Sequence, residues 1–234
     1  MMEIIEFKNV SHRDILHNIS GYFRENKITT FIGPSGAGKT TCLKHINGLL
    51  SPASGDVFYR GENINDADIV KLRKKAGMAF QSAPMLSGTV YDNLNLPLKI
   101  FNKELEQDRA IELLGMVELD GSFLERKVST LSGGEKSRIA LARTFVSKPE
   151  VLLLDEITSS LDYTLVREIE RLVQKLQQEH NLTVIWITHD LAQAERVSDD
   201  IWFLHRGELL LQGPIDTLYS SDNTIIQQFL RGER

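Results

Sequence analysis

The sequence predicts an α/β fold in which a largely parallel sheet carries a phosphate-binding loop. Residues 33–40, GPSGAGKT, fit the pattern G-x-x-x-x-G-K-[ST]; an apolar run over 28–32 precedes them and a helix is expected over 39–49. Two later segments, 151–154 and 182–187, are expected to be buried strands of a parallel sheet, and the first of them is continuously apolar. With 234 residues the chain can form one large domain or two small ones.

Composition and charge narrow the function classes. A net charge of −5 and a pI near 5.7 argue against a broad nucleic-acid-binding face, so we expect no nucleic-acid partner. Cys42 is the single cysteine, which excludes an intramolecular disulfide and fits a reducing compartment. No stretch approaches the ~20 apolar residues that span a bilayer, and residues 1–6 lack a signal-peptide pattern. We expect a cytoplasmic chain, soluble when isolated, that needs a partner for any membrane role.

The glycine-rich loop is predicted to hold the phosphates of a nucleoside triphosphate. Its three glycines let the backbone form a concave nest of N–H groups, and the following helix N-terminus adds partial positive charge. Lys39 should reach the β- and γ-phosphates, and the Thr40 hydroxyl should bind Mg²⁺. The predicted phosphate contacts are Gly33, Pro34, Ser35, Gly36, Ala37, Gly38, Lys39, Thr40 and Thr41.

The first third of the chain is rich in predicted strands, over 3–9, 19–23, 28–32 and 57–59. A loop at 51–55 closes the helix after the phosphate loop, and another helix is expected over 66–75. A buried strand over 77–80 then ends at Gln81. That glutamine would lie at the carboxyl edge of the sheet, where α/β proteins bind their ligands.

A helical segment follows, with apolar helical spacing over 89–95 and 105–119. We expect residues 82–145 to form a helical subdomain within a single domain of residues 1–234. Residues 1–81 and 146–234 are then expected to form the sheet-based core.

A second anion site is predicted at the end of the helical segment. Ser132 and Glu135 have the spacing of a capping box, and the helix is expected to run on to Phe145. The two glycines after the cap leave bare N–H groups at a helix N-terminus. A capped helix without a ligand is the alternative interpretation.

Two carboxylates follow the apolar run over 151–154. Asp155 is the expected Mg²⁺ partner, directly or through water, and Glu156 the expected base that polarises an attacking water. The alternative is an exposed acidic turn, which the phosphate loop makes less favoured.

The last third contributes one further polar candidate. Asp162 is predicted to cap a long amphipathic helix whose apolar stripe serves packing. His189 follows the strand over 182–187 and is expected to contact the γ-phosphate. A hairpin over 201–211 and a C-terminal helix after Pro214 carry no chemistry that the sequence identifies.

These motifs together resemble the ATP-binding subunit of an ABC transporter, and the resemblance covers nearly the whole chain. They occur in the family's order: the phosphate loop Gly33 to Thr41, the Q-loop glutamine Gln81, the signature Leu131, Ser132, Gly133, Gly134 and Glu135, the Walker B segment 151–156, the D-loop 159–162 with Asp162, and the switch histidine His189. The resemblance implies a P-loop NTPase (RecA-like) core with an N-terminal antiparallel β-subdomain and an inserted α-helical subdomain.

The resemblance also implies a mechanism and partners. Two copies would form an ATP-dependent head-to-tail dimer, with each ATP between the phosphate loop of one chain and the signature of the other. Glu156 would act as base, His189 and Gln81 would organise the γ-phosphate and water, and the Mg²⁺ ligands would be Thr40, Gln81 and Asp155. A transmembrane permease subunit would hold the chain peripherally at the cytoplasmic face of the membrane.

The sequence departs from the family's pattern in three places. Glu135 replaces the commonest signature glutamine, and Ile157 and Ser160 replace a usual proline and alanine. The aromatic residue that stacks on adenine is absent, so the resemblance leaves His12 or Arg13 to contact the base.

A finer resemblance concerns the transported substrate. Segments 89–94, 131–136 and 153–159 look like the FetA (YbbL) type of bacterial ATPase, which pairs with a FetB-type membrane subunit implicated in iron export. An importer ATPase for another small solute remains an alternative. A soluble ABC ATPase acting on nucleic acid or the ribosome is less favoured, because those proteins tend to carry a long coiled-coil insertion or two cassettes.

Overall fold

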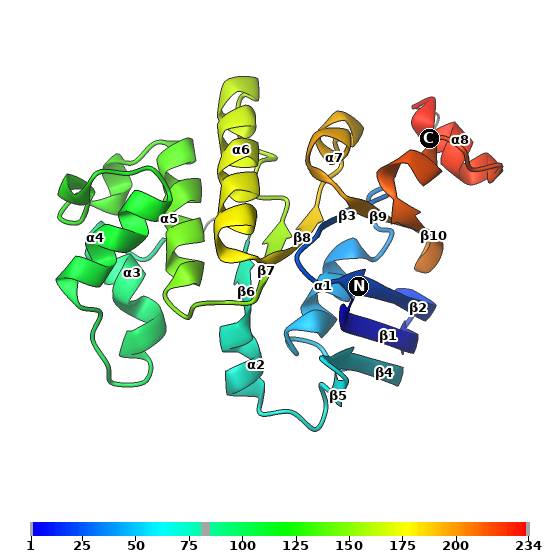
Figure 1. Ribbon diagram of the computed structural model, residues 1–234, viewed down its shortest axis with the longest axis horizontal. Coiled ribbons are helices and arrows are strands. Elements are labelled where there is room, and N and C mark those ends of the chain that lie inside the picture. The colour runs from blue at the N-terminus through cyan, green and yellow to red at the C-terminus, as the bar shows by residue number, and fades with distance from the viewer. Residues whose placement is uncertain (1, 81–84, 233–234) are drawn as a thin grey trace.

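A computed structural model describes residues 2–80 and 85–232 and contains two β-sheets flanked by helices (Figure 1). The larger sheet has six strands in the order β10–β9–β3–β8–β7–β6. All of its neighbouring strands pair in parallel except β9 and β10, which form an antiparallel hairpin. Its strands are β3 (Ile28–Ile32), β6 (Ala76–Ala79), β7 (Val151–Asp155), β8 (Thr183–Ile187), β9 (Asp200–His205) and β10 (Glu208–Pro214).

The smaller sheet is antiparallel and has the strand order β2–β1–β4–β5. Its strands are β1 (Glu3–His12), β2 (Leu16–Arg24), β4 (Ser54–Tyr59) and β5 (Glu62–Asn63). Together with the parallel sheet it confirms the predicted α/β fold with an N-terminal antiparallel β-region.

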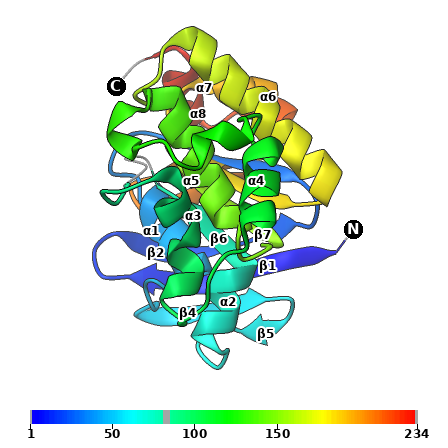
Figure 2. The same cartoon turned by 90° about the vertical axis from the view of Figure 1, so that its left-hand side faces the viewer.

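The helices lie on both faces of the larger sheet and beyond its β6 edge (Figures 1 and 2). In chain order they are α1 (Lys39–Ile46), α2 (Ile69–Lys75), α3 (Val90–Lys99), α4 (Gln107–Met116), α5 (Gly133–Phe145), α6 (Tyr163–His180), α7 (Leu191–Val197) and α8 (Thr224–Leu230). Short 3₁₀ turns occupy Gly121–Phe123, Val128–Thr130 and Ile215–Leu218. Helices α3, α4 and α5 form a group that the chain inserts between β6 and β7, and Figure 2 looks directly onto it. No helix among the described residues is both long and apolar enough to cross a membrane.

Alternating residues of β7 and β8 enter two separate cores, which explains why both faces of these strands are largely apolar. Leu152 and Leu154 of β7 join the core shared with α3–α6, whereas Val151 and Leu153 join the core beneath α1 and the antiparallel sheet. The second core contains stacked Phe23 and Trp202, with ring centroids 4.3 Å apart. The central strands are therefore fixed from both sides, as the sequence predicted.

Three helices differ from the sequence-based expectation, in where they end, where they begin or whether they were expected at all, and each difference has a local cause. Helix α1 stops at Ile46 because Gly48 adopts a left-handed φ of 63° and the Leu49 N–H returns to the Lys44 carbonyl. Helix α2 begins at Ile69 because the Asp68 carboxylate caps it, accepting from two backbone N–H groups. Helix α7 was not anticipated from the sequence, although Asp190 caps it in the same manner.

Candidate functional site

The phosphate loop leaves the carboxyl end of β3 and enters α1, at the edge of the sheet where β7 and β8 also end. Gly33 has φ 133°, and a Cβ added there would lie 2.0 Å from the Leu204 carbonyl oxygen at the end of β9. Gly38 has φ 101° and approaches Leu16 and the Ile15 carbonyl in the β1–β2 turn. Glycine is required at both positions by close backbone approach as well as by conformation.

The Lys39 side chain folds back over the loop and is nearly buried. Its ammonium donates to the carbonyl oxygens of Gly33 at 2.7 Å and Pro34 at 2.9 Å. Burial lowers the pKa of this ammonium from its ordinary value, against the attraction of Glu156 and Asp155. A partly desolvated cation inside a glycine-rich loop is suited to bind an anionic phosphate.

Thr40 and Asp155 meet across the start of α1 and the end of β7. The Thr40 hydroxyl donates to Asp155 Oδ1 at 3.1 Å. Burial raises the pKa of the Asp155 carboxyl, although the hydrogen bond from Thr40 acts in the opposite direction. A hydroxyl and a desolvated carboxylate beside a phosphate loop fit the oxygen ligands that Mg²⁺ prefers, so these residues suit the predicted ion.

Glu156 and His189 lie together, as the predicted site requires. Glu156 has a left-handed φ of 49°, and its N–H donates to the Ile187 carbonyl at 3.2 Å, which joins the ends of β7 and β8. Its Oε2 is 3.6 Å from His189 Nδ1, and the His189 side chain is 60% exposed. A cavity of about 180 Å³ contains both residues in its lining, together with Thr158, Ser159, Leu161, Val166, Thr188, Asp190 and Gln193. Gln81, the remaining predicted catalytic and Mg²⁺-binding residue, lies outside the described residues.

The signature segment forms the expected capping box at the start of α5. Ser132 Oγ accepts from the Glu135 N–H at 3.2 Å, and Glu135 Oε2 accepts from the Ser132 N–H at 2.7 Å. The hydrogen bond from the Ser132 backbone, with help from Arg126, holds the pKa of Glu135 below its usual range. Leu131 is buried, and Gly133 and Gly134 pack beside Leu161 and Leu165 of the D-loop and α6.

The two predicted anion sites of one chain do not meet. Within the described ranges, no hydrogen bond or ion pair connects residues 131–135 with residues 33–41. Asp162 follows both segments in the chain and caps α6, accepting from the Leu165 N–H at 3.0 Å. The signature is therefore not bonded to this chain's own phosphate loop in the part of the chain that the structure describes.

The two candidates for adenine binding have different environments. The His12 ring is only 9% exposed, contacts the Ser51 carbonyl through Nδ1 at 3.2 Å, and packs edge-on against His45. The ring is therefore engaged in packing within this chain, and its contact with adenine stays a prediction. Arg13 is exposed in the β1–β2 turn, with φ 49°.

Sequence reasoning missed Ile15, which lies in the same turn. Its side chain is 41% exposed, and its carbonyl lies beside Gly38 of the phosphate loop. An exposed branched apolar residue next to a phosphate loop offers a flat hydrophobic contact for a base. The sequence indicates only a turn between two strands at Ile15, and the fold is needed to show that this turn reaches the phosphate loop.

The C-terminal region also reaches the site, although the sequence assigned it no chemistry. A cavity of about 810 Å³ lies between the phosphate loop and α8. Its lining includes Gly33, Ser35 and His189 on one side and Phe229 and Leu230 on the other.

Comparison with known proteins finds relatives that are ATP-binding proteins of ABC transporters. A family described as "ABC transporter" matches residues 16–159. The putative ABC transporter ATP-binding protein YjkB of Bacillus subtilis is 39% identical over 94% of this chain and 87% of its own length. The Fe(3+) ions import ATP-binding protein FbpC of Photobacterium profundum is 35% identical over 98% of this chain and 66% of its own length.

Solved structures show the same fold. The cbiO1 protein of Clostridium perfringens, described as part of the ABC transporter complex cbiONQ, superimposes with a TM-score of 0.85 at 27% identity, covering 99% of this chain and 96% of that one. The ATP-binding cassette MJ0796, in a dimeric post-hydrolysis state bound to ADP and Pi, gives a TM-score of 0.79 at 32% identity, covering 91% and 99% of the two chains.

Proposed function

This chain belongs to the ABC transporter family as an ATP-hydrolysing subunit, and on that premise we propose which of its residues bind and cleave ATP. The phosphate loop, residues 33–41, wraps the phosphates through its backbone N–H groups. Lys39 exchanges its two carbonyl contacts for phosphate oxygens as ATP enters. Thr40 and Asp155 would hold Mg²⁺, which would supply positive charge beside the transferred phosphoryl group.

Glu156 is the proposed general base. It takes a proton from the attacking water inside the cavity that it shares with His189, and His189 donates a hydrogen bond toward the γ-phosphate. Gln81 is proposed to complete the ligands of Mg²⁺ and of the water. The observation that carries this proposal is the convergence of Lys39, Thr40, Asp155, Glu156 and His189 at one edge of the parallel sheet.

The nucleotide base is proposed to lie against the β1–β2 turn. Ile15 supplies an apolar contact there and Arg13 a planar guanidinium. An Ile15→Asp variant should weaken ATP binding, and unchanged affinity would remove the turn from the site.

We further propose that each ATP site is shared between two copies arranged head to tail. The separation of residues 131–135 from the phosphate loop within one chain supports this arrangement, as does the dimeric cassette found among the similar structures. Residues Leu131 to Glu135 then close over the γ-phosphate of the partner copy. The division into a core (1–81, 146–234) and a helical subdomain (82–145) is proposed to let the signature move during closure.

Complementation tests the shared site. Lys39→Ala destroys the phosphate side and Ser132→Arg blocks the signature side, so each variant alone should be inactive. In a mixed dimer both defects fall in one site and the other site is intact. An equimolar mixture should therefore recover about a quarter of the wild-type ATPase rate, because about half of the dimers are mixed and each has one working site. A mixture as inactive as its components would refute the shared site.

The proposed membrane partner is a transmembrane permease. Apolar side chains are exposed on both sides of residues 81–84, with Phe80 38% and Leu86 54% accessible. Phe101, just after α3, is also exposed and lies under the Lys74 ammonium of α2. The chain is then peripheral at the cytoplasmic face of the membrane. Leu86→Asp should reduce co-purification with a co-expressed transmembrane permease while leaving ATP binding intact.

For the substrate we propose a metal ion moved outward, with a FetB-like permease. Segments 89–94, 131–136 and 153–159 support this proposal through their resemblance to an iron-exporting type. One relative is named for Fe(3+) import. Inside-out vesicles containing both subunits should therefore accumulate iron on addition of ATP. Accumulation only in right-side-out vesicles that were loaded with ATP would replace export with import.

A further inference from the structure

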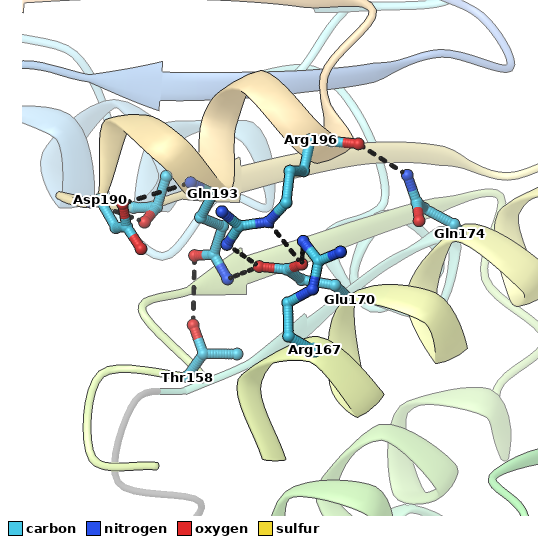
Figure 3. A network of polar contacts seen from close by, with 8 residues as sticks. Thr158, Arg167, Glu170, Gln174, Asp190, Gln193 and Arg196 are labelled. Atoms are coloured by element: carbon cyan, nitrogen blue, oxygen red, sulfur yellow. Dashed lines mark hydrogen bonds and ion pairs between the residues drawn. The ribbon is translucent and has the colours of Figure 1, made fainter. Parts of the chain in front are cut away.

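A buried polar cluster joins the two segments that carry Glu156 and His189 (Figure 3). Its centre is Gln193 of α7, which is 1% exposed, between Glu170 of α6 at 3% and Thr158 at 7%. Arg196 and Arg167 approach Glu170 from α7 and from α6 itself. The cluster lies at the wall of the cavity that holds the proposed base.

The charge of Glu170 fixes the direction of every hydrogen bond in the cluster. An ionised carboxylate only accepts, so the Gln193 amide must turn its Nε2 toward Glu170, at 3.1 Å. Its Oε1 then faces Thr158 and accepts from the hydroxyl at 3.2 Å. Arg196 donates to both oxygens of Glu170, at 3.0 Å and 2.6 Å, which keeps the carboxylate ionised.

Gln193 also contacts the segment of His189 through its backbone. Its N–H donates at 3.3 Å to Asp190, the residue after His189 and the cap of α7. Asp190 is in turn tied to Thr188 by a 3.0 Å hydrogen bond from its N–H to the Thr188 hydroxyl. Thr158, at the other end of the amide, is two residues beyond Glu156. One residue, through its side chain and its backbone N–H, therefore bridges the loop after β7 and the loop after β8.

We propose that Gln193, oriented by Glu170, is a positioning residue for ATP hydrolysis: it holds Thr158, and through it Glu156, at a fixed spacing from His189. The inference rests on the proposed role of Glu156 as base. Burying this many polar groups costs free energy unless each is paired, and apolar side chains between α6 and α7 would pack the two helices equally well. Accurate placement of Glu156 relative to His189 explains why this contact is polar, because a misplacement of about 1 Å can lower the rate about 10²-fold.

The chain supplies a matched control for this idea. Gln174 of α6 joins the same two helices, donating from Nε2 to the Arg196 carbonyl at 3.0 Å, but none of its hydrogen bonds reaches Thr158. Gln193→Met and Gln174→Met therefore remove one amide each from the same joint. Only the first removes the bridge to the loop of Glu156.

The experiment measures kcat and KM for ATP, and the melting temperature, in the full-length chain. Thr158→Val keeps the shape of the side chain and removes the hydroxyl; it should lower kcat about tenfold or more with KM changed less than about twofold. Thr158→Ser restores the hydroxyl and should restore kcat. Gln193→Met should match Thr158→Val, whereas Gln174→Met should keep kcat within about twofold of wild type.

Glu156→Gln, assayed in parallel, separates failure of this inference from failure of the proposed function. Wild-type turnover by Glu156→Gln would overturn the base assignment itself. With Glu156→Gln inactive, wild-type kcat in both Thr158→Val and Gln193→Met would overturn the positioning role, even with lowered melting temperatures. Equal losses of kcat in Gln174→Met and Gln193→Met would also overturn it, because general packing of α6 on α7 would then suffice.

Discussion

Substitution of Gly33 by alanine should destabilise the protein more than the same substitution three residues later. The added Cβ would lie 2.0 Å from the Leu204 oxygen and 3.0 Å from its carbonyl carbon, atoms of a paired strand that cannot rotate away. The backbone at φ 133° adds strain for any residue with a Cβ. Gly36 has φ 79° and no heavy atom within 4 Å of the added carbon, so Gly36→Ala carries strain alone.

The cost can be estimated from these two terms. Backbone strain is worth about 1–3 kcal/mol and forced overlap in a packed region about 1–3 kcal/mol more, so Gly33→Ala should lose about 4 kcal/mol. Gly36→Ala should lose about 1–2 kcal/mol. At about 2–4 °C per kcal/mol for a chain of this size, the expected falls in melting temperature are roughly 10 °C and roughly 4 °C.

Differential scanning fluorimetry without nucleotide measures both variants under one condition. Omitting ATP matters because both glycines line the phosphate site and ligand binding would add its own stabilisation. A Gly33→Ala melting temperature equal to that of Gly36→Ala would refute the close approach of the phosphate loop to the end of β9.

Three further predictions follow from the contacts at and around the site. Thr40→Val should weaken ATP binding about tenfold or more in Mg²⁺ but less than about threefold in EDTA, because it removes a charge-assisted oxygen contact. Calorimetry measures both affinities, and equal losses in the two buffers would exclude a metal role for the hydroxyl. Burial alone would raise the pKa of the Glu170 carboxyl, but the hydrogen bonds from Arg196 and Gln193 hold that pKa below its usual value. The ionised carboxylate therefore stabilises the fold fully above about pH 4.3, and this contribution disappears as the pH falls through the folded pKa. The difference in melting temperature between wild type and Glu170→Gln should be largest near pH 7 and should shrink below about pH 4. Glu135→Gln should lower the melting temperature by less than about 3 °C, because glutamine preserves a capping box and the half-exposed ion pair with Arg126 contributes little; a larger fall would show that the charge itself holds α5.

Features encoded in short stretches of sequence were predicted well. Strand β3, the start of α1 and the Ser132–Glu135 capping box each depend on residues within a few positions of one another, and each is confirmed. The continuous apolar run over 151–154 likewise predicted β7, because a strand covered on both faces has no polar side, and the mostly apolar segment 182–187 predicted β8. The catalytic roles assigned to Glu156 and His189 stay predictions that the variants above test.

Features that depend on strand register or on distant packing were not predictable in the same way. His12 turns inward because the pairing of β1 shifts near Val10, where Asn9 takes φ 50°, and simple alternation cannot give that shift. Helix α7 has only seven residues, too few for a clear apolar period, so the element that carries Gln193 was missed. The bridge from Gln193 to Thr158 joins residues 35 positions apart, and nothing in either local sequence indicates it.

The insertion between β6 and β7 has a geometric consequence. Because these strands are parallel neighbours and α5 leads directly into β7, α5 acts as the crossover helix and must run opposite to the strands. Its N-terminus therefore returns to the carboxyl edge of the sheet, the edge from which α1 also starts. The positive dipole ends of α1 and α5 therefore face the same edge of the larger sheet, which makes that edge favourable for anions.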